Sequence, residues 1–336
     1  MLGAVADSAR ETADPALVLE RGCAVFDRSE RGKLALSGTD AIEFLNGQVT
    51  NELQGLAAGE GRYAAFLNHK GGMLGDARIL HAVDPGAPEL GELLLLDMER
   101  AALQPVFDTI RAHSVGFDVV LHKRTLERGQ LTLIGPRSSE LAAARHLGEA
   151  EHDSATVTIA GVQALAVRTD VGVDVFCDAA ALAQLHESFI AGGAIAGDEQ
   201  SAAALRIESG RPLFGVDIEP GTIPQEAGLN ERAVSFTKGC YVGQETVARL
   251  FYKGRPNRSL RGLGAARPLR EGEAVTLDGR AIGRVGSAAL SPRFGPIALA
   301  LLRREAQPGV QVELEDGGEA TVVELPFAAV PAGEHR

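Results

Sequence analysis

The sequence contains no tryptophan, and aromatic side chains make up only 4% of its 336 residues. Aromatic platforms that stack nucleic-acid bases are therefore not expected. The formal net charge of −12 argues against nucleic-acid binding by the surface as a whole, although a local basic site is compatible with it. The function must therefore be inferred from local motifs.

Cysteine is also scarce: Cys23, Cys177 and Cys240 lie far apart and are odd in number. They form no disulfide framework and fit a reducing compartment. No Cys-x-x-Cys pair or Cys/His cluster has the spacing of metal ligands, so no metal site is predicted. The first twenty residues lack a basic region followed by an apolar core, so no signal peptide is predicted, and the longest apolar runs are too short to span a bilayer. We therefore expect a cytoplasmic protein.

The remaining composition is that of a globular protein, with 45% hydrophobic and 23% charged residues. Strand and helix patterns are interleaved up to about residue 250, without a Gly-x-Gly-x-x-Gly nucleotide motif, which predicts an α+β fold. From about Ser259, short strand patterns with glycine-rich turns predict a small antiparallel β-barrel. We expect an α+β region over residues 20–250, with subdomains near 20–125 and 126–250, and a barrel over 257–330.

Local sequence signals predict the bounds of two helices and one strand. Asp40 and Gly47 are expected to cap and stop a helix over Ala41–Asn46. A strand is predicted at Phe117–Leu121 and a helix at Ser138–His146.

The segment Lys238–Arg249, KGCYVGQETVAR, carries the strongest chemical signal. Cys240 stands between glycines and precedes a helical pattern at Gln244–Leu250, with a lysine and an arginine nearby. A helix N-terminus and neighbouring cations lower the pKa of a thiol and favour the nucleophilic thiolate. A free cysteine can equally be a small buried hydrophobe, and both interpretations stay open. Cys240 and Lys238 are therefore candidate catalytic residues.

The same segment resembles the signature of the YgfZ family, K-G-C-[FY]-x-G-Q-E-x-x-x-R, at every specified position. YgfZ proteins are relatives of the glycine cleavage T-protein, the tetrahydrofolate-dependent aminomethyltransferase, and the wider resemblance runs from about Ala24 to Phe327. It implies a T-protein-like fold and tetrahydrofolate or a derivative as cofactor. It also implies support for the assembly or repair of iron–sulfur enzymes, such as a tRNA methylthiotransferase, and thereby for tRNA modification.

Asp76 lies in the second strand of a predicted hairpin, Arg62–Leu67 and Met73–Val83. From the residues alone it points into a cleft or is an exposed strand residue. The T-protein has G-G-x-x-D-D here, with an acid near the reactive folate nitrogen. This chain has Gly75 followed by Asp76, so one acid is missing. The resemblance implies a catalytic and folate-binding Asp76, unless Gly75 takes the place of the essential acid.

Two further motifs resemble folate-contacting segments of the T-protein. Arg168–Asp174 is similar to a shortened R-T-G-Y-T-G-E-x-G-x-E loop, with Asp170 and Asp174 in the places of its glutamates. Carboxylates suit the paired donors of a pterin ring, while a turn with solvated acids is the alternative. Residues 202–215 resemble L-R-[LI]-E-x-G-x-P-x-[FY]-G, whose arginine lies at the folate pocket and corresponds to Arg206. A solvated arginine on a helix face is the alternative.

A basic stretch between Thr246 and Arg270 contains no acid and seven cations: Arg249, Lys253, Arg255, Arg258, Arg261, Arg267 and Arg270. It suits the polyglutamate tail of a folate, an RNA backbone, or a linker whose charges pair with acidic neighbours. Arg249 is a candidate cofactor-binding residue. Three functions therefore remain: a folate-dependent helper of iron–sulfur enzymes, an aminomethyltransferase, and a non-enzymatic RNA or protein adaptor.

Overall fold

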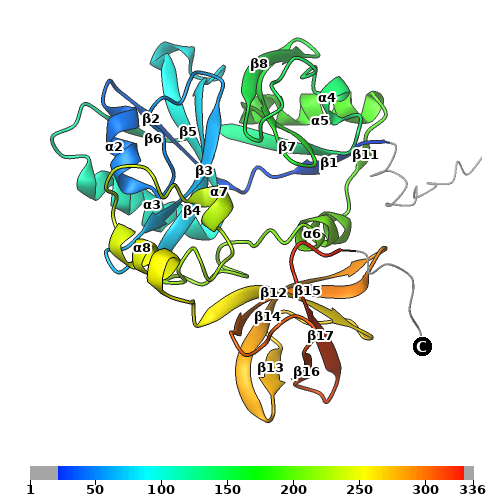
Figure 1. Cartoon of the computed structure of the whole chain (residues 1–336). Helices are drawn as coiled ribbons and strands as arrows, with labels where there is room; N and C mark the ends of the chain where they lie inside the picture. The colour runs from blue at the N-terminus through cyan, green and yellow to red at the C-terminus, as the bar shows by residue number, and fades with distance from the viewer. Residues whose placement is uncertain (1–21, 329–336) are drawn as a thin grey trace, which may run out of the picture.

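A five-stranded antiparallel sheet forms the first α+β region, with strand order β3-β4-β5-β2-β6. The protein is described here by a computed structural model over residues 22–328, so the predicted absence of a signal peptide in the first twenty residues lies outside the described residues. Helix α3 packs against β4 and β2, and a 3₁₀ turn, η1, precedes β5 (Figure 1). The elements are β2 (Gly32–Ser37), α2 (Ala41–Gln48), β3 (Gly61–Leu67), β4 (Met73–Val83), η1 (Pro88–Leu90), β5 (Glu92–Met98), α3 (Arg100–His113) and β6 (Val120–Lys123).

A second, six-stranded sheet has the order β11-β1-β7-β10-β9-β8. Its first strand, β1, precedes the whole first sheet in sequence, yet it pairs with β7 and β11. A cut near residue 125 therefore does not separate the two regions. The elements are β1 (Ala24–Asp27), β7 (Arg128–Ile134), α4 (Ser138–Leu141), β8 (Ser154–Ile159), β9 (Val162–Arg168), β10 (Gly172–Asp178), η2 (Ala179–Ala181), α5 (Leu182–Ala191) and β11 (Ile195–Ala196).

The part of the chain that follows the second sheet packs against the first sheet. Phe214, Leu229, Tyr241 and Val247 are buried in the core of the first sheet. This segment contains α7 (Asn230–Ala233) and α8 (Gln244–Lys253). The core of the first region is therefore built from both ends of the α+β part of the chain.

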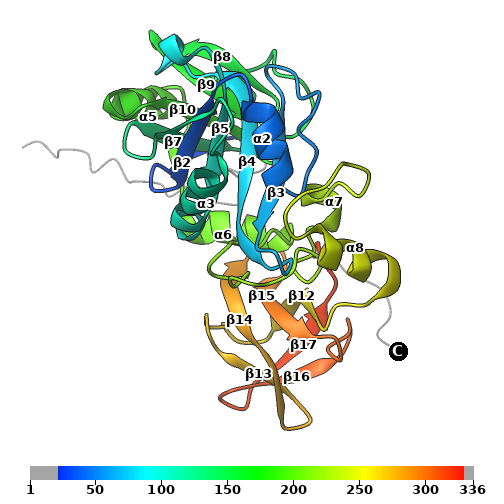
Figure 2. The same ribbon diagram turned by 90° about the vertical axis from the view of Figure 1, so that its left-hand side faces the viewer.

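The C-terminal part is the expected closed antiparallel barrel, with order β12-β15-β14-β13-β16-β17. Helix α6 (Glu199–Glu208) lies between the barrel and the second sheet (Figures 1 and 2). Glu208 accepts a hydrogen bond from Ser291 of the barrel at 2.6 Å. The strands are β12 (Arg258–Ala265), β13 (Ala274–Leu277), β14 (Arg280–Ser291), β15 (Gly295–Arg303), β16 (Gln311–Leu314) and β17 (Glu319–Val323). None of the helices within residues 22–328 has the length and apolar character needed to cross a membrane.

Four local expectations are wrong. Asp40 does not cap α2, because its carboxylate accepts a hydrogen bond from the backbone N–H of Asp118 instead. Gly47 does not end this helix, which continues to Gln48. The helix from Ser138 ends at Leu141, before Ala143 adopts a positive φ of 51°, which a helix cannot contain. The strand expected at 117–121 begins only at Val120.

Candidate functional site

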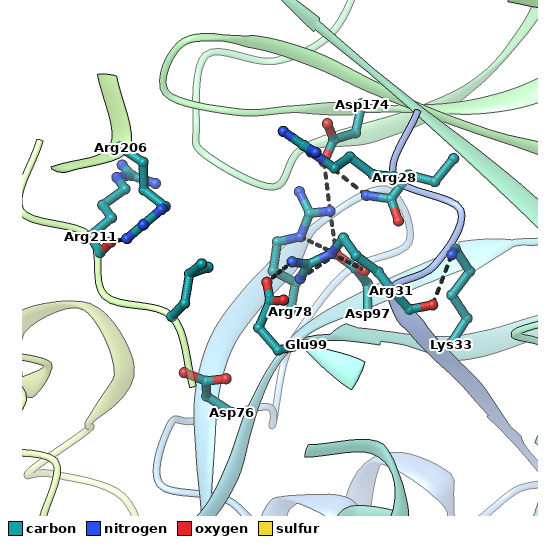
Figure 3. Close-up of polar contacts among 12 residues, drawn as sticks. Arg28, Arg31, Lys33, Asp76, Arg78, Asp97, Glu99, Asp174, Arg206 and Arg211 are labelled. Carbon is teal, nitrogen blue, oxygen red and sulfur yellow. Dashed lines mark hydrogen bonds and ion pairs between the residues drawn. The ribbon is translucent and has the colours of Figure 1, made fainter. Parts of the chain in front are cut away.

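A cleft with a volume of about 250 Å³ lies where the two sheets and the segment after α6 meet. Its walls include Asp76 from β4, Asp174 from β10, Asp170 from the β9–β10 turn and Arg206 from α6. Figure 3 shows Asp76, Asp174 and Arg206 on different sides of a common space. Folding thus brings together four predicted cofactor-binding residues.

A buried ionic network joins the sheets at one side of the cleft. Asp97 on β5 accepts hydrogen bonds from Arg31 Nε at 2.8 Å and from Arg78 Nε at 2.7 Å. Arg78 also reaches Asp174 on β10 of the second sheet at 2.6 Å. Burial opposes ionisation of Asp97, but the two arginines outweigh it and hold its pKa far below the ordinary value. Because it spans both sheets, this network defines one wall of the cleft.

Asp76 has a different environment. Its side chain is buried, and its Oδ2 accepts a hydrogen bond from Tyr63 Oη at 2.5 Å. Among the described residues no arginine or lysine forms an ion pair with it, whereas Asp97, Asp170 and Asp174 each have an arginine partner. Burial raises the pKa of Asp76 to about 6, although the Tyr63 hydrogen bond opposes this rise. Asp76 is therefore the acid of the cleft that can change protonation near neutral pH.

Positions 75 and 76 are neighbours on β4 and therefore face opposite sides of the sheet. Successive strand residues point to opposite faces of a sheet. A Cβ at Gly75 would lie 2.6 Å from the Cβ of Ala102 on α3, so position 75 faces that helix and has room only for glycine. Of the two positions, only 76 can present a carboxylate to the cleft.

Asp174 and Asp170 are each paired with a different arginine. Asp174 is 4% exposed, so the alternative of a solvated turn acid does not apply to it. Its Oδ2 pairs with Arg78, while its buried Oδ1 has no hydrogen-bond partner. Asp170 pairs with Arg211 Nε at 2.9 Å, and burial raises its pKa. Both carboxylates are thus fixed by arginines at the cleft.

Arg206 is not a solvated helix residue. Its Nη1 donates to the backbone oxygen of Arg211 at 2.7 Å and to Asp217 Oδ2 at 3.1 Å. Asp217 in turn accepts hydrogen bonds from the N–H and hydroxyl of Ser287 in the barrel. Arg206 therefore lines the cleft and also ties α6 to the barrel.

Lys238 and Cys240, the candidate catalytic residues of the motif, do not line the cleft, and neither does Arg249. The Nζ of Lys238 is surrounded by four oxygens at 2.6–3.0 Å: the backbone oxygens of Asn46, Val49 and Asn51 and the side-chain oxygen of Asn46. Burial lowers the pKa of Lys238 to about 8. Its ammonium group therefore binds the C-terminal end of α2 and the residues that follow it.

The cysteines differ in accessibility. Cys240 is exposed, so the alternative of a buried hydrophobe does not apply to it, and α8 begins four residues later at Gln244. Cys23 and Cys177 are buried, and burial raises the pKa of each thiol to about 11.

Some cations of the basic stretch between Thr246 and Arg270 form salt bridges and others do not. Arg258 binds Glu226 at 2.9 Å, Arg270 binds Asp316 at 2.8 Å, and Arg261 and Arg267 also have carboxylate partners. The linker interpretation accounts for these four cations. No salt bridge within residues 22–328 involves Arg249, Lys253 or Arg255.

Two models of protein domains match the chain. The model of the GCVT N-terminal domain matches residues 9–238, and that of the glycine cleavage T-protein C-terminal barrel domain matches residues 258–328. The chain belongs to the glycine cleavage T-protein family.

Relatives within the T-protein family align over most of the chain. It is 30% identical to an aminomethyltransferase of Streptomyces avermitilis, covering 94% of this chain and 88% of the relative. It is 26% identical to one of Thermotoga neapolitana, with coverages of 93% and 88%. The crystal structure of the glycine cleavage system aminomethyltransferase T from Bartonella henselae superposes with a TM-score of 0.80 at 25% identity, covering 94% and 89% of the two chains.

Several residues that line the cleft were not predicted from the sequence: Arg31, Tyr63, Arg78, Asp97 and Arg211. One signal was available, because Arg78 follows Asp76 by two positions and therefore lies on the same face of β4. The contributions of Asp97 and Arg31 depend on strand pairing across the sheet, which the motifs do not contain.

Proposed function

We propose that the chain binds tetrahydrofolate or a derivative in the cleft. The T-protein resemblance implies this cofactor. The supporting observation is that Asp76, Asp170, Asp174 and Arg206, each matched to a T-protein folate motif, come from three motifs that are separate in sequence and line one cleft. If the motifs resembled those of the T-protein only by chance, their side chains would have no reason to line the same cleft.

The residues of the cleft fit the chemistry of a reduced folate. Asp174 keeps a buried oxygen without a partner, which suits a donor on the pterin ring. Arg206, Arg211 and Arg232 also line the cleft and suit the carboxylates of the glutamate tail. When bound, the folate supplies the nitrogen atoms that carry a one-carbon unit. Asp76, with a pKa of about 6, would hold or release a proton beside it.

The finer proposal is a YgfZ-type role in supporting iron–sulfur enzymes, and it depends on the Lys238–Arg249 motif. Two motif residues have structural reasons to be present. Lys238 binds four oxygens, and Gly243 has a φ of 82° with its Cβ position 2.6 Å from the backbone oxygen of Asn68. Cys240 is exposed and has no comparable packing role. We propose that its thiol is the reactive group of the motif.

Aminomethyl transfer is the second candidate. It is favoured by Asp76, which faces the cleft and titrates near neutral pH, and by the aminomethyltransferase relatives. Turnover by the purified chain in a reconstituted glycine cleavage system, in place of an authentic T-protein, would favour this candidate over the YgfZ-type role. Absence of turnover by a chain that still binds folate would favour the YgfZ-type role over aminomethyl transfer.

Folate binding is directly measurable. We expect isothermal titration calorimetry to show saturable binding of tetrahydrofolate to the full chain. Arg211→Gln should weaken binding by about tenfold, because it removes a cation from the cleft. The matched control is Arg270→Gln, an arginine on the barrel, which should bind as tightly as the wild type. The proposal would be refuted if millimolar tetrahydrofolate produced no heat in the titration and no shift of the melting temperature.

Cys240 is expected to react fastest of the three thiols with iodoacetamide in the native protein at neutral pH. It is exposed, whereas Cys23 and Cys177 are buried and have pKa values raised to about 11. Mass spectrometry of labelled peptides gives the relative rates, and labelling in denaturant is the control. Equal rates in the native protein would contradict the exposure of Cys240.

The same residue tests the YgfZ-type role. In a deletion strain, Cys240→Ser should fail to restore iron–sulfur enzyme activity and thiomethylated tRNA while keeping wild-type folate affinity, because serine lacks the nucleophilicity of a thiolate. The exposed neighbour Thr237 offers a control, since Thr237→Ser should restore both. Full complementation by Cys240→Ser would eliminate the thiol from the function and leave folate binding as a separate question.

A further inference from the structure

Three aromatic side chains gather at α8, outside the cleft. Phe236 and Phe251 stack with ring centroids 3.7 Å apart, and Tyr252 meets Phe251 edge-on at 5.0 Å. Tyr252 is 67% exposed, more than any other aromatic side chain in the described part of the chain. The low aromatic content made such a cluster unexpected, and it forms because folding places Phe236 against α8.

The exposed aromatic rings are flanked by cations. Arg249, Lys253 and Arg255 are all exposed, and none has a salt-bridge partner among residues 22–328. Lys70, another exposed cation, belongs to the β3–β4 loop, whose Gly71 packs against Gly243 and Thr246 at the start of α8. Glu245, at the first turn of α8, is the acid of this helix. Figure 2 shows α8 at the outer edge of the molecule, beside α7.

We propose that Arg249, Phe251, Tyr252, Lys253 and Arg255, here termed the α8 surface, bind a single-stranded nucleic acid. Unpaired bases stack on exposed aromatic rings, and cations beside the rings pair with the phosphates. An acidic polypeptide would use the cations but has no bases for Tyr252 to stack on, so the aromatic group favours a nucleic acid. This activity is separate from folate binding, because no residue of the α8 surface lines the cleft.

The test is fluorescence anisotropy of a labelled oligouridylate with the full chain at low ionic strength. Tyr252→Ala should weaken binding by about tenfold, as expected for loss of one stacked base. Tyr252→Phe should keep the affinity, because the ring remains. Arg249→Ala and Lys253→Ala should each make the slope of log affinity against log salt shallower by about 0.7, as for one phosphate contact on a single strand.

Intrinsic fluorescence provides a second measurement. The chain has no tryptophan and three tyrosines, of which only Tyr252 is exposed. Unlabelled oligouridylate should therefore quench tyrosine emission in the wild type and leave the residual emission of Tyr252→Phe unchanged. Circular dichroism would confirm that the variants are folded.

Arg270→Ala is the matched control, because Arg270 is an exposed cation of the same basic stretch but is paired with Asp316. It should leave the affinity unchanged. An oligodeoxythymidylate that binds with the same sensitivity to Tyr252→Ala would also support the proposal. Absence of oligouridylate binding at low salt, or binding unaffected by Tyr252→Ala, would overturn it. Displacement by poly-L-glutamate as effective as by oligouridylate would also overturn it and indicate a surface for acidic polypeptides.

Discussion

Asp76→Asn is expected to raise the thermal stability of the protein at pH 7.5 while removing any one-carbon chemistry in the cleft. Burial raises the pKa of Asp76 from 3.8 to about 6, so the folded protein disfavours the ionised form. Two pKa units correspond to at most about 3 kcal/mol. Asparagine carries no charge and can still accept the Tyr63 hydrogen bond. The melting temperature should therefore rise by several degrees.

The gain should depend on pH in a defined direction. Below about pH 3 the carboxyl group is mostly protonated in both the folded and the unfolded chain, so it costs almost no stability. Between about pH 4 and 6 only the unfolded carboxyl ionises, and the stability of the wild type falls as the pH rises. The advantage of Asp76→Asn should therefore be nearly absent near pH 3 and complete above about pH 7. Scanning calorimetry across this range measures it.

The control is an aspartate with the opposite shift. Hydrogen bonds from Thr39 lower the pKa of the exposed Asp118, so Asp118→Asn should give no gain in stability at pH 7.5. An equal gain in both variants would mean that reduced net charge, rather than burial of Asp76, is responsible. Retained turnover of Asp76→Asn in an active glycine cleavage assay would show that another group supplies the proton chemistry.

Lys238→Met is expected to destabilise the protein by about 3–5 kcal/mol. Methionine has a similar shape but no donor, so four oxygens that now bind Nζ would lose a partner in a buried position. Each buried acceptor left unpaired costs about 1–3 kcal/mol, reduced where water or small shifts supply a replacement. Two of them, the backbone oxygens of Asn46 and Val49, lie at the C-terminal end of α2, where a positive charge also favours the helix dipole.

Urea unfolding would measure this loss, with Lys253→Met as the control. Lys253 is exposed and makes no salt bridge within residues 22–328, so its replacement should change stability by less than about 0.5 kcal/mol. Similar stability of Lys238→Met and the wild type would mean that the four hydrogen bonds of Lys238 are not required for folding.

Local sequence was sufficient to predict elements whose own residues determine them. The β3–β4 hairpin follows from two strand patterns joined by Asn68–Gly72, and the barrel follows from short strands separated by turns. The burial of Cys177 also follows from the apolar strand that contains it, and that of Cys23 from the apolar strand that it directly precedes. In each case the information lies within a few residues of the feature, so no knowledge of distant partners is required.

The chemical character of the cleft required the tertiary structure. Asp76 and Asp97 are both buried strand aspartates, yet their pKa values shift in opposite directions because two arginines form ion pairs with Asp97 and none among the described residues forms one with Asp76. Strand alternation and the packing of α3 decide that residue 76, rather than 75, faces the cleft. These outcomes depend on which side chains meet across the sheets.

The sequence by itself determined the α+β and barrel classes and the motifs that indicate the T-protein family, because periodicity, turn residues and motif spacing are local properties. Only the tertiary structure decided where α2 ends, since its last carbonyl groups are bound by a lysine 192 positions away from Asn46. It likewise placed β1 in the second sheet and left three cations of the basic stretch without salt-bridge partners within residues 22–328. The physical reason is that hydrogen bonds and ion pairs form between atoms that are close in space, and sequence separation does not specify which distant groups will meet.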